Sequence, residues 1–198
     1  MSRYPDVETF LTSVRRGYQA SDMDPDTRRC VNAVFAALEA GNGERNEGGR
    51  RFPACEYLDA AARLVEGKRP EFEAIMASFT ALESLIDWTR RPGGTNASAN
   101  IMEGHANAMV VGPGGLEARD DVQVGISLLA PNVRYPDHRH KPEETYLCLT
   151  PGEFRHGDDG DWFSPGVGGS FYNHPDMLHA MRSGEQPLLA VWCLRRVG

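Results

Sequence analysis

Residues 135–146, with the sequence YPDHRHKPEETY, concentrate side chains that bind metals and transfer protons. His138 and His140 are separated by one residue, and Glu144 and Tyr146 follow with the same spacing. Side chains two positions apart on a strand project from one face, so the members of each pair are predicted to share a face. If the short turn between the pairs brings them together, two imidazoles, a carboxylate and a phenol converge. Such a set is typical of the ligands of a divalent transition metal, with an ionisable phenol beside the ion.

A further metal ligand is expected from elsewhere in the chain, and His179 is the preferred candidate. His179 begins an apolar stretch that is typical of a strand, whereas His174 directly precedes a proline and is expected in a turn. The remaining histidines, His105, His156 and His174, are interpreted as surface loop residues. The same interpretation is less favoured for the proposed ligands, because four suitable side chains with this spacing rarely coincide in a chain of six histidines.

Two tyrosines accompany the proposed ligands. Tyr146 is predicted to project toward the same ion as Glu144, and a nearby metal ion would lower the phenol pKa from its usual value of about 10. A phenolate is a suitable general base near neutral pH, so Tyr146 is predicted to be catalytic, with packing in a β-barrel as the alternative. Tyr135 is a candidate for a pocket wall or a hydrogen-bond donor, and packing is an equally good interpretation.

The first half of the chain is predicted to be helical. Apolar residues recur with helical periodicity over residues 7–18 and 24–41, and the second of these stretches opens with an Asp-Pro pair that is typical of a helix start. Further helices are predicted over Ala54–Glu66 and from Pro70 to before Pro92. Between them and the first two helices, the glycine-rich segment Gly41–Arg51 is predicted to be a mobile loop.

The second half is predicted to be β structure. Turn residues recur about every 8–12 positions, which is typical of an all-β sandwich or barrel. The fold class is therefore α+β, mainly β, with a helical region (residues 1–105) packed on a small β-barrel (residues 106–198) that carries the metal site. The sequence leaves open whether the helices cover a face of the barrel or mediate a homodimer. The clearest strand candidates are Gln123–Leu129, Thr145–Leu149, Ser170–Tyr172 and Leu188–Leu194.

Composition excludes several classes of function. The 198 residues are 40% hydrophobic, which is enough for a buried core, and the net charge of −7 argues against a nucleic-acid partner. No stretch approaches the roughly 20 apolar residues of a membrane helix, and the N-terminal residues lack the apolar region of a signal peptide, so a cytoplasmic location is expected. The four cysteines are scattered along the chain and are predicted to be reduced and mostly buried.

These motifs resemble those of the cupin superfamily. His138-x-His140-x3-Glu144 is similar to the first cupin metal motif, and Gly169-x5-Pro175 followed by His179 is similar to the second. The fuller string, in which Tyr135-Pro136 precedes the first histidine and Tyr146 follows the glutamate, resembles the signature of the cupin-type dimethylsulfoniopropionate lyases of the DddQ type. Proteins of this family combine a helical N-terminal part with a C-terminal cupin barrel, and the motif resemblance extends over about residues 120–198.

The resemblance implies a function for each residue of the motif. His140, Glu144 and His179 would hold one divalent transition metal ion (zinc, iron, manganese, cobalt or nickel), with His138 as a fourth ligand or a close neighbour. Tyr146 would be the catalytic base, in contact with substrate. Tyr135 would line the substrate pocket.

The implied reaction is a β-elimination that converts a small zwitterionic sulfonium substrate, dimethylsulfoniopropionate, into dimethyl sulfide and acrylate. It requires no redox change and no organic cofactor. Aromatic faces attract cations, so a cage around the sulfonium group is expected. The candidates for this cage are Tyr135, Trp162, Phe171, Tyr172 and Trp192.

Two other functions remain open at the level of sequence. A cupin dioxygenase would use the same ligands with iron and would consume oxygen, although its chemistry does not require a tyrosine at position 146. A non-catalytic metal or ligand sensor would bind its ligand stoichiometrically without turnover. Since the chain has no basic face for DNA, the partner of such a sensor would be a protein.

Overall fold

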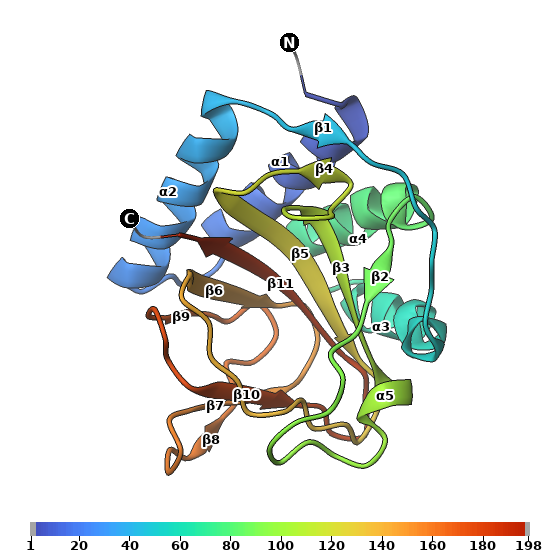
Figure 1. Ribbon diagram of the computed structural model, residues 1–198, viewed down its shortest axis with the longest axis vertical. Coiled ribbons are helices and arrows are strands. Elements are labelled where there is room, and N and C mark those ends of the chain that lie inside the picture. Colours follow the sequence, from blue (N-terminus) through green and yellow to red (C-terminus); the bar gives the residue numbers. More distant parts are fainter. Residues whose placement is uncertain (1–2, 197–198) are drawn as a thin grey trace.

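A computed structural model describes residues 3–196. The molecule is an α+β structure, mainly β, in which helices from the N-terminal half lie against the outside of a β-barrel (Figure 1). The predicted fold class is therefore confirmed. The helices are α1 (Pro5–Gln19), α2 (Pro25–Ala40), the 3-10 helix η1 (Pro53–Tyr57), α3 (Leu58–Val65), α4 (Pro70–Glu83) and α5 (Ile101–Gly104).

Two sheets form the barrel. The larger has the strand order β1-β4-β3-β5-β11-β6-β9, with β2 paired to β3, and the smaller has the order β10-β7-β8. The strand predictions made from sequence are confirmed as β5, β6, β9 and β11. The strands are β1 (Glu44–Arg45), β2 (Trp88–Thr89), β3 (His105–Val111), β4 (Glu117–Ala118), β5 (Val122–Leu129), β6 (Glu143–Cys148), β7 (Glu153–His156), β8 (Trp162–Phe163), β9 (Ser170–Asn173), β10 (His179–Arg182) and β11 (Leu188–Arg195).

The long helices cover the outer face of the larger sheet. Helix α2 begins at an Asp24 cap, whose side chain accepts hydrogen bonds from the backbone of Asp26 and Thr27. Its apolar stripe packs against β6, β9 and β11. The hydroxyl of Tyr18 on α1 donates to the backbone oxygen of Thr145 on β6 at 3.1 Å. The helices therefore cover a barrel face, which was one of the two arrangements that the sequence left open.

Successive side chains of β6 point to opposite faces of the larger sheet and so belong to two different hydrophobic clusters. Leu147 belongs to the cluster between helices and sheet, whereas Tyr146 and Cys148 belong to the cluster inside the barrel. The cluster between the helices and the sheet includes residues from before and after position 105. The proposed division into a helical region (residues 1–105) and a barrel (residues 106–198) stays a prediction. Because Glu144 is two residues before Tyr146, its side chain also faces the barrel interior.

The segment Gly41–Arg51, predicted to be a loop, contains β1. The backbone of Asn46 donates to Leu116 at 2.9 Å, and the Arg45 guanidinium pairs with Asp6 at 2.8 Å. The prediction missed this strand because charged and glycine residues carry little β propensity, so its pairing with β4 depends on the rest of the fold.

Two helix boundaries also differ from the predictions. The helix predicted over Ala54–Glu66 begins as η1 and becomes α-helical only at Leu58. The next helix ends at Glu83, well before Pro92, and the chain then forms β2. Trp88 on β2 is fully buried and donates its indole N–H to the Glu83 carboxylate at 2.6 Å, so burial of this large side chain draws the segment into the sheet.

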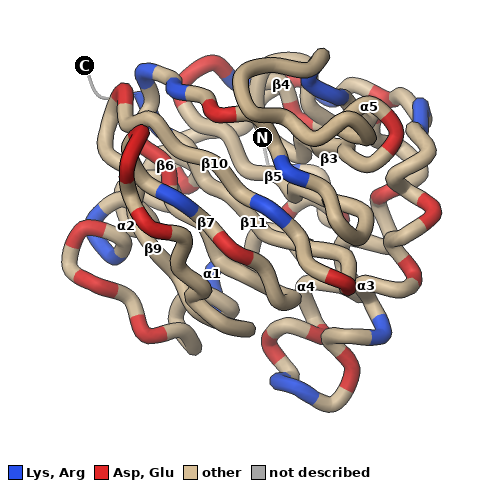
Figure 2. Tube along the Cα trace, turned by 90° about the horizontal axis from the view of Figure 1, so that it is seen from below, with Lys and Arg blue, Asp and Glu red and all other residues tan. Residues whose placement is uncertain are grey.

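The surface and the cysteines agree with the composition. Basic and acidic residues are interspersed over the side of the molecule seen in Figure 2. None of the helices in residues 3–196 is long and apolar enough to span a membrane. All four cysteines are buried and unpaired, as predicted.

Candidate active site

Pairing between two distant segments assembles the histidines. His138 and His179 form an antiparallel bridge, with reciprocal backbone hydrogen bonds of 3.0 and 2.9 Å. Strand β10 begins at His179, as predicted, but the segment that carries His138 and His140 contains only isolated bridges. Pro136 and Pro142 interrupt it, because proline has no N–H to donate to a sheet ladder.

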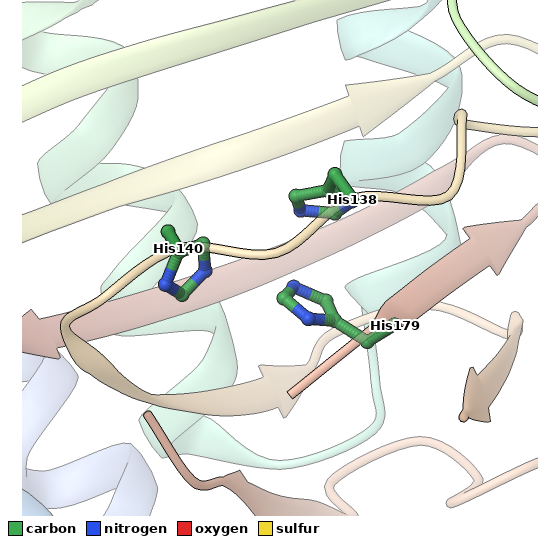
Figure 3. Close-up of side chains that lie close together, drawn as sticks. All are labelled: His138, His140 and His179. Carbon is green, nitrogen blue, oxygen red and sulfur yellow. The ribbon is translucent and has the colours of Figure 1, made fainter. Parts of the chain in front are cut away.

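The three imidazoles converge on one point inside the barrel (Figure 3). One ligand atom from each of His138, His140 and His179 lies within 4.8 Å of the others. Each Nδ1 lies within hydrogen-bond distance of a backbone carbonyl oxygen, which orients the ring and leaves Nε2 as the ligand atom. The acceptors are Pro136, Pro142 and Met177, at 3.0, 2.9 and 2.9 Å.

Glu144 completes this cluster. Its Oε2 lies 3.3 Å from His140 Nε2 and 3.1 Å from His179 Nε2, and the residue is only 3% exposed. Burial by itself raises the pKa of the Glu144 carboxyl, but the contacts with His140 and His179 hold that pKa far below its usual range. Burial lowers the pKa of His138 to about 3, so its ring is neutral at pH 7. An anionic carboxylate and a neutral imidazole are the forms that bind metals.

The cluster meets the chemical requirements of a transition-metal site. The buried Nε2 of His179 lies close to Glu144 without forming a hydrogen bond, so its lone pair is available at the point where the other rings converge. Three imidazole nitrogens and one carboxylate oxygen suit zinc, iron, manganese, cobalt or nickel. The structure groups His138 with His140 and His179 without distinguishing it from them.

A cavity of about 170 Å³ opens onto this cluster. His138, His140 and Glu144 line it together with both candidate tyrosines, Tyr135 and Tyr146. One small cavity thus brings together residues that were proposed for the site from the sequence. Thr89, Arg91, Asn107, Met109, Gln123, Ser127, Met181, Trp192 and Leu194 complete the lining.

Of the proposed sulfonium cage, only Tyr135 and Trp192 line the cavity. Phe171 lies behind Tyr146, with the two rings stacked at 5.4 Å. Tyr172 donates its hydroxyl to Glu143 and faces Arg29 of α2. Trp162, on the smaller sheet, packs against Arg182, whose guanidinium carbon lies 4.2 Å from the centre of the indole ring. These last three positions do not fit a cage within this cavity.

Tyr146 is 4% exposed and its environment favours the neutral phenol. Burial and the neighbouring Glu144 carboxylate raise the Tyr146 pKa well above its usual value of 10. Burial also raises the pKa of Tyr135, with Arg91 acting in the opposite direction. The Tyr135 ring lies between two imidazoles, 4.6 Å from His105 and 4.8 Å from His138.

The interpretation of the other histidines is correct for one of three. His174 is exposed, as predicted. His105 is fully buried at the start of β3, because its pairing with β5 places the ring against Tyr135 inside the barrel. His156 is a half-buried residue of β7 paired with His179, rather than a loop residue.

Asn173 is a polar neighbour of the site that the sequence analysis missed. Its Nδ2 donates to Glu144 Oε2 at 2.9 Å, and the residue is 1% exposed. The sequence offered one indication of its position: side chains alternate between the two faces of β9, so Asn173 shares a face with Phe171. That signal points to Glu144 only once the pairing of β6 with β9 is known.

A small, mainly antiparallel barrel with three histidines and a glutamate converging inside it defines a cupin with a candidate metal centre. The family model for dimethylsulfoniopropionate lyase matches residues 26–190. The chain therefore belongs to the dimethylsulfoniopropionate lyase family and is a lyase, as the motif resemblance predicted.

Individual relatives agree with this assignment. The chain is similar to the dimethylsulfoniopropionate lyase DddQ of Ruegeria pomeroyi, with 27% identity over 144 residues, which are 71% of this chain and 69% of the relative. The crystal structure of that DMSP lyase DddQ matches with a TM-score of 0.72 at 22% identity, over 98% of this chain and 92% of the other. A chain from the crystal structures of the DMSP lyases RdDddP and RnDddQII gives a TM-score of 0.69 at 16% identity, over 98% and 93%. The fold is thus shared along the helical half as well as the barrel.

Proposed function

We propose that this protein cleaves dimethylsulfoniopropionate by β-elimination into dimethyl sulfide and acrylate. Family membership supports the substrate. The observation that carries the mechanism is the position of Tyr146, whose phenol lines the same small cavity as His138, His140 and Glu144. An elimination of this kind needs a base at the Cα–H bond and stabilisation of negative charge on the adjacent carboxylate, and this arrangement offers both.

In this proposal His138, His140, Glu144 and His179 hold one divalent transition metal ion. Such an ion supplies positive charge that lowers the pKa of a neighbouring phenol and stabilises negative charge on a substrate carboxylate. The carbonyl contacts at the three Nδ1 atoms orient the rings before binding. Glu144 contributes the anionic ligand.

Tyr146 is the proposed base. As a phenolate it accepts the Cα proton, the released electron pair forms the Cα–Cβ double bond, and the C–S bond breaks to release dimethyl sulfide. Packing against Phe171 and Phe154, at 5.4 Å from each ring, restricts the phenol. Because the protein's own side chains raise the pKa of Tyr146, the phenolate depends on added positive charge in the site.

The remaining lining of the cavity suits a small zwitterion. Trp192 and Tyr135 present aromatic rings, which attract a sulfonium cation. Met109 and Met181 add apolar surface. Arg91 is exposed and lines the cavity, where its charge attracts a carboxylate. A homodimer and a cytoplasmic location stay predictions.

Headspace gas chromatography tests this function. Protein loaded with each candidate metal in turn is incubated with dimethylsulfoniopropionate, and dimethyl sulfide is measured for wild type, Tyr146→Phe and Tyr172→Phe. Tyr172 is the matched control, since it lies on the adjacent strand β9 and hydrogen-bonds Glu143 rather than facing the cavity. We expect Tyr146→Phe to lose about 10²–10⁴-fold in rate with its metal content unchanged, and Tyr172→Phe to stay active.

Two results would contradict the proposal. An active Tyr146→Phe would remove the tyrosine from the role of base. No dimethyl sulfide from wild type with any of the five metals would reject the lyase function, and oxygen consumption would then favour the dioxygenase.

A further inference from the structure

Besides His179 Nε2, two buried polar atoms on residues next to the candidate ligands have no hydrogen-bond partner. They are Asn173 Oδ1 and His156 Nε2. Leaving a buried donor or acceptor unsatisfied costs about 1–3 kcal/mol, so such atoms are rare in protein interiors. Here both lie on residues that adjoin the candidate metal ligands, since Asn173 pairs with Glu144 across β6 and β9, and His156 pairs with His179 across β7 and β10.

The orientation of the Asn173 amide follows from the chemistry of its neighbour. An ionised carboxylate only accepts hydrogen bonds, so the amide nitrogen must face Glu144, and it does so at 2.9 Å. The amide oxygen must then face away from Glu144 and needs a donor of its own.

His156 carries the other unpartnered atom, and the two atoms are not hydrogen-bonded to each other in the structure. Its ring lies 5.6 Å from Phe171, which projects from the same face of β9 as Asn173. An imidazole with its proton on Nε2 donates one hydrogen bond, which is what Asn173 Oδ1 lacks. Burial and His179 lower the pKa of His156, while Asn173 acts in the opposite direction, which agrees with an amide oxygen close to the ring.

We propose that His156 and Asn173 act in series to position Glu144 as a metal ligand. A small shift of the two side chains lets His156 Nε2 donate to Asn173 Oδ1 and so fix the amide, which holds Glu144 Oε2 where His140 and His179 converge. An amide NH₂ group has no lone pair for a metal, so this hydrogen bond is free to persist when an ion is bound. Both are positioning residues, and the inference depends on the proposed metal site.

Zinc affinity measures this role directly. The dissociation constant for Zn²⁺ is determined by competition with a chromogenic chelator for wild type, Asn173→Ala and the isosteric Asn173→Asp. Loss of a group that orients a ligand typically weakens metal binding by about 10–100-fold, and we expect both variants to fall in that range. Tyr172→Phe, on the residue before Asn173 and directed away from the site, is expected to bind zinc as wild type does.

Two variants at position 156 separate hydrogen bonding from packing. His156→Phe suits the aromatic contacts with Phe163 and Phe171 but has no donor, and we expect weaker zinc binding. His156→Gln restores a donor N–H and is expected to return the affinity to within a few-fold of wild type. Thermal unfolding of the metal-free proteins is measured in parallel, because a purely structural role would lower the unfolding temperature without selectively weakening zinc binding.

The outcomes are distinguishable. Wild-type zinc affinity in folded Asn173→Ala or Asn173→Asp would overturn the inference. If His156→Phe binds zinc as wild type does, or if His156→Gln is as weak as His156→Phe, the role of His156 is overturned. If wild type itself binds none of zinc, iron, manganese, cobalt or nickel, the proposed metal site fails instead.

Discussion

Acidification is expected to destabilise the folded protein through His105. This residue is fully buried, and neither of its ring nitrogens forms a hydrogen bond in the structure. Burial lowers the pKa of His105 from its usual 6.5 to about 4. The ring is therefore neutral in the folded protein at a pH where the unfolded chain is already protonated.

The sign and size of the effect follow from proton linkage. Between pH 6.5 and about 4 the unfolded state binds more protons than the folded state, so stability falls as the pH falls. The pKa difference is 6.5 minus about 4, or about 2.5, and is worth about 3 kcal/mol once the pH reaches about 4. About 2 kcal/mol of this is lost between pH 7 and pH 5.

Urea unfolding of metal-free protein at pH 7 and pH 5 tests this prediction with a His105→Leu variant. At pH 7 the variant loses an edge-to-face contact with Tyr135 that is worth about 0.5–1.5 kcal/mol, but it also removes two buried ring nitrogens that have no hydrogen-bond partner, so the prediction concerns only the change in stability with pH. Between pH 7 and pH 5 the wild type should lose about 2 kcal/mol more than the variant. The control His174→Gln alters an exposed histidine and should follow wild type. Parallel losses in wild type and His105→Leu would refute the reasoning.

Three further predictions concern the cavity. Trp192→Leu is expected to raise KM by about 2–30-fold, corresponding to the roughly 0.5–2 kcal/mol of a cation–aromatic contact, and an unchanged KM in steady-state kinetics would remove this ring from the sulfonium site. Arg91→Gln is expected to raise KM by a few-fold at low salt and by less at high salt, because the side chain is exposed; a salt-independent effect would argue against electrostatic attraction. Glu144→Gln removes the anionic ligand and is expected to weaken zinc binding by at least about 10-fold in the chelator competition, whereas unchanged affinity would exclude this carboxylate from the ligand set.

The grouping of the candidate site residues could be predicted where these residues are close in sequence. The spacing of His138, His140, Glu144 and Tyr146 indicates a shared cavity, and the strand-like residues after His179 indicate that it belongs with them. The regular strand expected around His138 is absent, because prolines on both sides limit its pairing to a bridge with His179. The bridge nevertheless directs the side chains to the same place.

The neighbours of the site depend on long-range pairing and were not predictable. Asn173 reaches Glu144 only through the register of β6 and β9, and His156 approaches the site only through the pairing of β7 with β10. His105 looks like a loop residue beside glycine and is buried because β3 pairs with β5. The positions of the aromatic residues were still harder to predict from the sequence, since the face on which Trp162 or Tyr172 lies depends on which sheet its strand joins.

The central claim is that the metal centre and Tyr146 together eliminate dimethyl sulfide from dimethylsulfoniopropionate. The most direct test is to measure dimethyl sulfide and acrylate together from wild-type protein, first after chelation and then after one metal at a time is restored. We expect equal amounts of both products with at least one of zinc, iron, manganese, cobalt or nickel, and loss of both products after chelation. Undiminished release from fully chelated protein, or dimethyl sulfide without an equal amount of acrylate, would contradict it.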